Sequence, residues 1–124
     1  MSERKTVPAA GTWGPIIGYS RAVRVGQAVH VAGTTAPGAD LAEQTRGAFG
    51  VALDAIAELG ATVDDVVRTR MFLTDISQWE AAGRVHGELF GDVRPVTTMV
   101  EVSNLIDAEL LIEIELEALL PEGR

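Results

Sequence analysis

The chain has 124 residues, of which 47% are hydrophobic and 23% charged, and its formal net charge at pH 7 is −8. This length predicts a single domain over residues 1–124, large enough to bury a hydrophobic core. The acidic balance argues against nucleic acid as a partner, since nucleic-acid binding needs a basic surface. No apolar run approaches the roughly 20 residues of a membrane span, and no signal peptide is recognisable. The chain has no cysteine, which excludes disulfides and thiolate chemistry. We therefore expect a cytoplasmic protein that contacts neither nucleic acid nor membranes.

The first half of the chain predicts a β-hairpin followed by a helix. Two short alternating runs flank a glycine-containing turn, which is typical of a hairpin. Further on, Asp40 and Glu43 have the spacing of a capping box, and apolar residues then recur with helical period. The predicted elements are strands at 21–25 and 28–32, a loop at 33–39, and a helix that follows Asp40 and ends at Gly60.

The second half predicts three strands and one further helix. A second capping pattern, from Ser77 to Glu80, opens that helix, and Gly91 ends it. The predicted elements are a strand at 66–74, the helix up to Gly91, a strand at 96–102, a connector at 103–109 and a strand at 110–119. The order ββαβαββ indicates an α+β fold with a mixed β-sheet and both helices on one face.

The last three predicted strands carry apolar residues at successive positions, and therefore on both faces of the sheet, as in Val66-Val67 and Leu111-Ile112. A chain this short has too few elements to cover both faces of a sheet. We therefore expect the second face to be buried against another copy of the chain.

Three glutamates alternate with apolar residues along the last predicted strand. The period of two places Glu113, Glu115 and Glu117 on one face, roughly 6.8 Å apart at successive positions. Repulsion between neighbouring carboxylates raises the pKa of one of them, which suits a general base acting on water. The alternative is a solvated polar face, and the pattern favours that alternative for Glu115 and Glu117.

A polar cluster opens the strand before it, at Arg94-Pro95-Val96-Thr97-Thr98. Proline fixes the entry into the strand, and an arginine fork beside threonine hydroxyls suits a carboxylate or carbonyl ligand. The alternative is an ordinary strand start with an exposed arginine.

Other signatures of chemistry are missing from the sequence. His30 and His86 have no close sequence partner, so packed or surface histidines are favoured over metal ligands. Neither a serine-nucleophile motif nor a glycine-rich phosphate loop occurs. We expect no metal and no cofactor.

Several short stretches become specific when they are taken together in order and spacing. They are 18–26, 31–33, 44–46, 60–67, 74–75, Phe90, Arg94-Pro95, 100–102 and 113–115. In these the chain resembles the Rid family (reactive intermediate deaminases, also called YjgF or L-PSP endoribonuclease proteins), from about Gly18 to Ala118. The resemblance implies a chorismate-mutase-like fold, assembly as a homotrimer, and small-molecule sites in the clefts between subunits.

The resemblance also implies an activity, the hydrolysis of reactive imines and enamines to a keto acid and ammonia. Glu113 matches the glutamate that positions the attacking water, and Tyr19 matches a tyrosine that lines the pocket. We expect Glu113 to be the catalytic residue and to share one cleft with Thr97, with Arg94 or a side chain of another subunit at its mouth. The full set of predicted substrate-binding residues is Tyr19, Gly33, Thr34, Arg94, Pro95, Thr97 and Thr98.

The chain departs from the family pattern at three places. Thr97 stands where the family has a carboxylate-binding arginine, Gly83 stands where an asparagine is usual, and the loop from Gly33 to Gln44 is short. Loss of the arginine predicts a cleft without a fixed positive charge, and so a substrate shifted away from simple 2-imino acids. Three hypotheses stay open: a deaminase, a non-catalytic metabolite-binding trimer, and, disfavoured by the acidic charge, an endoribonuclease.

Overall fold

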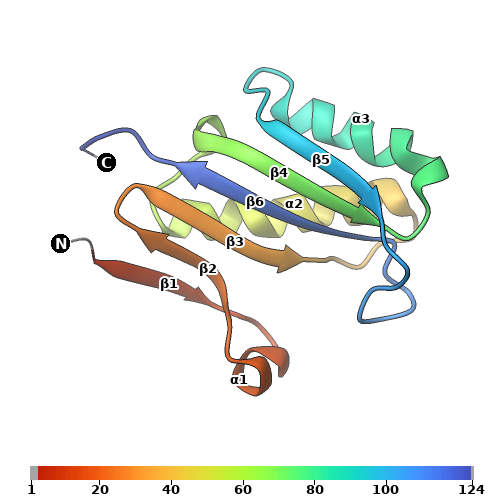
Figure 1. The fold of residues 1–124 in the computed structure, drawn as a ribbon, viewed down its shortest axis with the longest axis horizontal. Helices are drawn as coiled ribbons and strands as arrows, with labels where there is room; N and C mark the ends of the chain where they lie inside the picture. Colours follow the sequence, from red (N-terminus) through yellow and green to blue (C-terminus); the bar gives the residue numbers. More distant parts are fainter. Residues whose placement is uncertain (1–2, 124) are drawn as a thin grey trace.

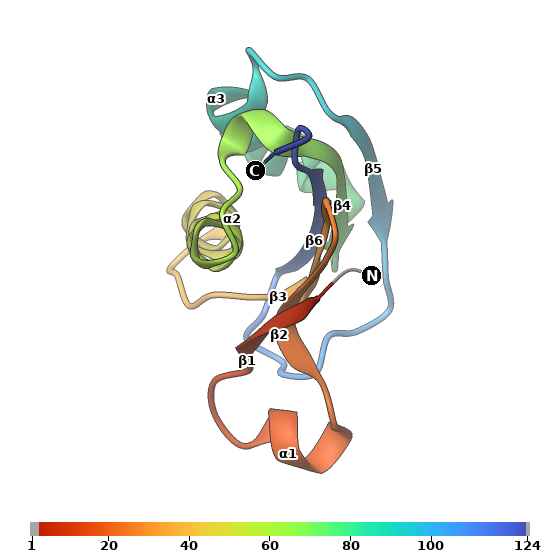
Figure 2. The same ribbon diagram turned by 90° about the vertical axis from the view of Figure 1, so that its left-hand side faces the viewer.

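A computed structural model describes residues 3–123 and contains one six-stranded sheet with two long helices on one face (Figures 1 and 2). The strands lie in the order β1-β2-β3-β6-β4-β5, and all pairs are antiparallel except β4 with β5. The elements are β1 Arg4–Pro8, α1 Trp13–Ile17, β2 Ser20–Val25, β3 Ala28–Thr34, α2 Leu41–Glu58, β4 Val66–Leu73, α3 Trp79–Phe90, β5 Val96–Glu101 and β6 Ile112–Leu119, with short 3₁₀ turns at Val63–Asp65 and Ile76–Gln78.

Alternation along β6 separates a covered face of the sheet from an open one. Its apolar residues, Ile112, Ile114, Leu116 and Ala118, are buried and belong to the core, whereas its glutamates are half-buried on the other face. Helices α2 and α3 both lie on the apolar side, as Figure 2 shows. Phe49 of α2 and Phe90 of α3 meet edge to face there, with ring centroids 5.2 Å apart. The glutamates therefore face away from the helices.

The predicted α+β class, the ββαβαββ order and the placement of both helices on one face are confirmed. Strand β1 and helix α1 precede that series and were not predicted. The five residues of β1 lie at the sheet edge and are mostly exposed, so they carry no apolar alternation. Helix α1 is equally short, at five residues.

The ends of the elements test the capping predictions. Asp40 accepts a hydrogen bond from the Glu43 N–H at 2.9 Å and caps α2, as predicted. Gly60 follows that helix with a φ of +90°, which glycine adopts without strain. The predicted cap at Ser77 is wrong: Asp75 accepts from the Ser77 N–H at 3.0 Å and caps a 3₁₀ turn, and α3 begins only at Trp79.

The open face of the sheet exposes apolar side chains in the single chain. Val96 and Val100 of β5 have exposed fractions of 59% and 40%, and Val67 of β4 is 46% exposed. Polar groups lie between them, with Arg70 of β4 contacting Glu115 at 3.4 Å. Burial of this face against another copy stays a prediction.

Candidate functional site

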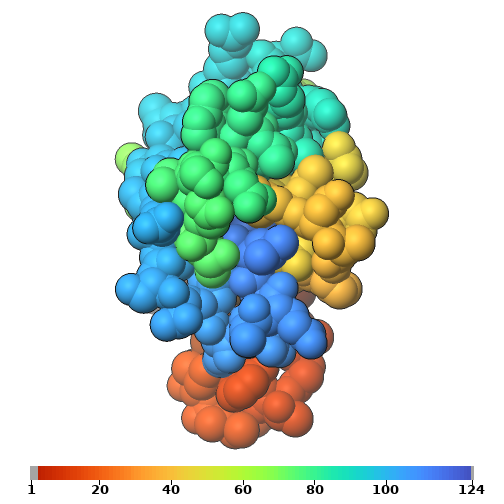
Figure 3. Space-filling view, turned by 90° about the vertical axis from the view of Figure 1, so that its right-hand side faces the viewer, coloured from red at the N-terminus to blue at the C-terminus, as the bar shows by residue number. Residues whose placement is uncertain are grey.

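A cavity of about 540 Å³ lies where α1 and the connector before β6 approach strands β2, β3 and β6. Figure 3 shows the segment of α1 (orange) at one end of the molecule, next to that connector (blue). Trp13, Ile17 and Ile106 contribute apolar wall. The polar side of the lining includes Tyr19, Arg21, Gly33, Thr34, Thr35 and Glu113.

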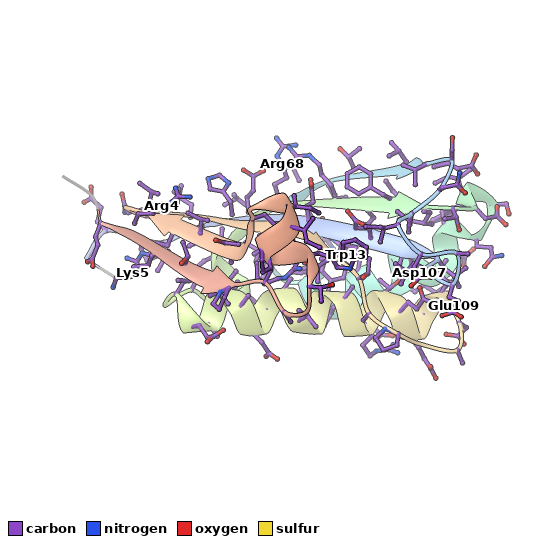
Figure 4. All side chains as sticks on the ribbon, turned by 90° about the horizontal axis from the view of Figure 1, so that it is seen from below. Arg4, Lys5, Trp13, Arg68, Asp107 and Glu109 are labelled. Atoms are coloured by element: carbon purple, nitrogen blue, oxygen red, sulfur yellow. The ribbon has the colours of Figure 1, made fainter. Side chains whose placement is uncertain are left out.

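A second cavity, of about 580 Å³, shares Trp13 and Ile106 with the first. Asp107 and Glu109 lie along it, and Figure 4 labels both together with Trp13. Trp13 therefore forms part of the wall of both cavities. The chemistry below concerns the first cavity, which contains Glu113.

Glu113 lies directly against the backbone of β3. A methyl group built on Gly33 would come within 2.2 Å of the Glu113 Oε2 atom, a separation that real atoms do not occupy. The pairing of β3 with β6 is irregular between Val31 and Thr34, next to this contact. Glycine at position 33 therefore leaves the space that the carboxylate occupies.

The surroundings of Glu113 make its carboxylate more basic. Burial raises the pKa of Glu113, the charge of Glu115 raises it further, and the nearby Arg21 opposes both effects. A carboxyl group with a raised pKa is a better proton acceptor when ionised. The charge repulsion predicted along β6 thus contributes to this pKa, but desolvation contributes more.

Glu113 also predicts a pH dependence of stability. Because the pKa of Glu113 is raised in the folded state, folding favours its protonated form. The stability that this adds is fully present below the pKa of the unfolded chain and is lost as the pH rises through the pKa of the folded protein. We expect Glu113→Gln to raise the melting temperature relative to wild type more at pH 7 than at about pH 4. Calorimetry of both proteins across this range measures the difference, and a difference that does not grow with pH would contradict the prediction.

Arg21 of β2 is the residue that links the polar lining. Its Nη1 donates to the Gly33 carbonyl at 2.8 Å and to Thr34 Oγ1 at 2.9 Å. Its Nη2 donates to the Tyr19 hydroxyl at 3.2 Å, and its guanidinium carbon lies 5.6 Å from the centre of the Tyr19 ring. The expectation of a cleft without a fixed positive charge is therefore wrong.

Sequence reasoning missed Arg21, although a signal was available. Two positions separate Arg21 from Tyr19, and residues two apart share a face in extended chain. The predicted strand begins at residue 21 and β2 begins at Ser20, so Tyr19 lies just before the strand in both. Tyr19 immediately precedes β2, so extending the predicted strand by two residues would have paired the two side chains.

The structure brings together four of the predicted site residues and leaves four apart. Tyr19, Gly33, Thr34 and Glu113 line the cavity. Arg94, Pro95, Thr97 and Thr98 lie in or before β5, at the opposite edge of the sheet from β1.

Thr97 faces α3 instead of the cavity. Its hydroxyl accepts a hydrogen bond from Thr69 at 2.6 Å, and Thr69 Oγ1 lies 2.8 Å from Nε2 of His86 on α3. The sequence predicts that Thr97 and Glu113 share one cleft, but they do not lie together within a single chain. A ligand role for Thr97 stays a prediction that requires a second subunit.

Arg94 precedes β5 and has a backbone conformation that differs from that of a strand. Its φ is +54°, and its Nε donates to the Gly91 carbonyl at 3.0 Å. Strand alternation therefore does not decide which way its side chain points.

Both histidines have structural partners. His30 Nδ1 lies 3.0 Å from Glu117, and His86 packs against the rings of Phe49 and Phe90. Burial lowers the pKa of His86. Within residues 3–123, no group of three or more histidine, aspartate or glutamate side chains is placed to hold a metal ion. No helix in that range has the length and hydrophobicity to cross a membrane.

Comparison with known proteins identifies the family to which this chain belongs. The model of the family described as Endoribonuclease L-PSP matches residues 11–120. An uncharacterized protein of Streptomyces coelicolor is 43% identical over 121 residues, which cover 92% of this chain and 90% of that protein. A RutC family protein of Pyrococcus abyssi is 33% identical over 109 residues, covering 82% of this chain and 85% of its own.

A solved structure agrees with these matches. A Mycobacterium tuberculosis member of the YjgF/YER057c/UK114 family superposes with a TM-score of 0.93 at 50% identity, covering 95% of this chain and all of that one. The chain therefore belongs to the L-PSP endoribonuclease family, also called the YjgF or Rid family.

Proposed function

We propose that this protein hydrolyses a reactive imine or enamine to a carbonyl compound and ammonia, with Glu113 as the residue that holds and deprotonates water. The observation that carries the proposal is the position of Glu113. It is half-buried in a cavity, lies against the Gly33 backbone, and has a raised pKa. This is the environment in which a carboxylate works as a general base.

The reaction needs only water as a second reactant. Water, losing its proton to Glu113, adds through oxygen to the imine carbon and forms a carbinolamine. Glu113 returns that proton to the nitrogen, which completes the carbinolamine. Glu113 then takes the hydroxyl proton and passes it to the nitrogen as the carbon–nitrogen bond breaks, so the oxygen forms the carbonyl and ammonia leaves. An enamine enters the same sequence after protonation at carbon gives the imine.

Ammonia release from imines tests this proposal directly. Amino-acid oxidases generate short-lived imines of several amino acids, and the protein is added during their formation. We expect ammonia to form faster than in buffer, since the cavity supplies a positioned base. Equal rates with and without the protein, for every imine offered, would reject deamination and favour a module that binds a metabolite without converting it.

We further infer a homotrimer with its ligand sites between subunits. The support is the open sheet face, where Val67, Val96 and Val100 are exposed in the single chain. We expect sedimentation at micromolar concentration to give three times the 13.1 kDa mass of one chain. A charge placed in this face by Val100→Asp should shift the protein toward smaller species. A monomeric wild type would contradict the trimer and its shared sites.

Cleavage of RNA is the activity that the family description names. The net charge of −8 opposes it, because phosphate binding draws its affinity from basic side chains. We expect no saturable RNA binding at physiological salt in filter or fluorescence assays. Salt-sensitive binding together with cleavage by freshly purified protein would overturn this expectation.

A further inference from the structure

Arg21 is a half-buried cation that interacts with the charge of Glu113 across the cavity but makes no direct ion pair. Among residues 3–123, no carboxylate lies within ion-pair distance of it, whereas Arg68 and Arg70 on the same sheet contact Glu117 at 3.7 Å and 3.3 Å. Its three hydrogen bonds go to neutral oxygens. Burying a charge costs free energy unless an opposite charge compensates it. Glu113 does so only without direct contact, so the site favours an anion that contacts the guanidinium.

The guanidinium retains hydrogen-bonding capacity for that anion. Arginine has five N–H groups, and the contacts to Gly33, Thr34 and Tyr19 use both on Nη1 and one on Nη2. The Nε–H and the second Nη2–H are left over from these contacts. Because the Tyr19 hydroxyl accepts from Arg21, its own proton is free to be donated to a ligand oxygen.

Arg21 and Glu113 line one cavity but form no ion pair with each other. A ligand can therefore place a carboxylate at the cation while its reactive carbon faces the carboxylate base. Contacts to Gly33 and Thr34 hold the guanidinium in place, so little rotamer freedom is left to lose on binding.

We propose that Arg21, together with the Tyr19 hydroxyl, selects ligands that carry a carboxylate next to the reactive carbon. This inference rests on the proposed site beside Glu113. It assigns the anion-binding role to β2, in place of the β5 position occupied by Thr97. Arg21 positions and selects the ligand, and it takes no part in proton transfer.

A pair of probes that differ in one charge tests the proposal. Calorimetry measures binding of 2-oxobutanoate and of its neutral amide, 2-oxobutanamide, to wild type, Arg21→Gln and Arg21→Lys. Arg84→Gln is the matched control, because Arg84 lies exposed on α3 and pairs with Glu80. We expect wild type and the control to prefer the acid. Arg21→Gln should lower affinity for the acid about 10–100-fold, and for the amide by less than about threefold.

The outcomes distinguish selection of a carboxylate ligand by Arg21 from a purely structural role in which Arg21 only holds Gly33 and Thr34. Equal losses for acid and amide, or a wild type without preference for the acid, would overturn the proposal. Thermal unfolding checks that each variant folds. If Arg21→Gln does not fold, Arg21→Lys decides. Lysine keeps the positive charge but lacks the paired N–H donors of the guanidinium. A reduced preference of Arg21→Lys for the acid therefore supports the proposal, and an unchanged preference contradicts it.

Ammonia release from wild type, measured in the same buffer, distinguishes this inference from the proposed function. Release without any Arg21-dependent preference overturns the role of Arg21 and leaves the deaminase proposal standing. An Arg21-dependent preference without release rejects the deaminase and leaves the anion site standing.

Discussion

Replacing Glu113 with glutamine is expected to slow ammonia release from imines by about 10²–10⁴-fold, the usual contribution of a positioned general base. Glutamine keeps nearly the same shape beside Gly33 but cannot accept a proton from water. The change also removes a half-buried charge, so the variant should fold at least as well as wild type at neutral pH. Initial rates with several imines measure the effect, and thermal unfolding confirms the fold.

Glu115→Gln is the matched control for this experiment. Glu115 points to the same sheet face two residues further along β6, but it contacts Arg70 and is not part of the cavity lining. We expect its rate to stay within about threefold of wild type. Because Glu115 raises the pKa of Glu113, its removal should move the acid limb of the pH–rate profile to lower pH. Full activity of Glu113→Gln would make Glu113 structural and favour the binding module.

Local sequence patterns were enough to predict most elements of the fold. The alternation of apolar residues and glutamate in β6 predicted that the three glutamates share one sheet face, and the Asp40 cap marked the start of α2. Strand β1 left no such pattern, because its residues are mostly exposed at the sheet edge. The position of β6 between β3 and β4 depends on pairings far apart in sequence, which local periodicity does not contain.

The site was predictable where the resemblance supplied residues that lie on neighbouring elements. Tyr19, Gly33 and Glu113 come together because β2, β3 and β6 are adjacent in the sheet. Thr97 lies apart from Glu113 in the single chain because β4 separates β5 from β6, and because its hydroxyl turns toward α3. Alternation assigns residues to two faces, but it does not say which face meets the helices.

Replacing Gly33 with alanine is expected to reduce ammonia release by about 100-fold while leaving the fold intact. The added methyl would meet Glu113 Oε2 at 2.2 Å and Cδ at 2.9 Å, so the carboxylate must move. The end of a flexible side chain moves cheaply, and the free energy of unfolding should change by less than about 1 kcal/mol. A displacement of about 1 Å at a catalytic group is enough to cost this much rate.

Gly50→Ala provides the matched control, since nothing lies within 4 Å of a methyl group built at Gly50 on α2. Alanine in a helix should stabilise the protein by about 0.5–1 kcal/mol, and the rate should not change. Chemical denaturation and initial rates on the same samples give both quantities. The double variant Gly33→Ala with Glu113→Gln should be no slower than Glu113→Gln alone, because both changes act through one carboxylate. A Gly33→Ala protein that keeps the full wild-type rate would show that catalysis does not depend on holding Glu113 against the β3 backbone. If the rate reductions of the two single variants multiply in the double variant, Gly33 affects the rate by a route other than the Glu113 carboxylate.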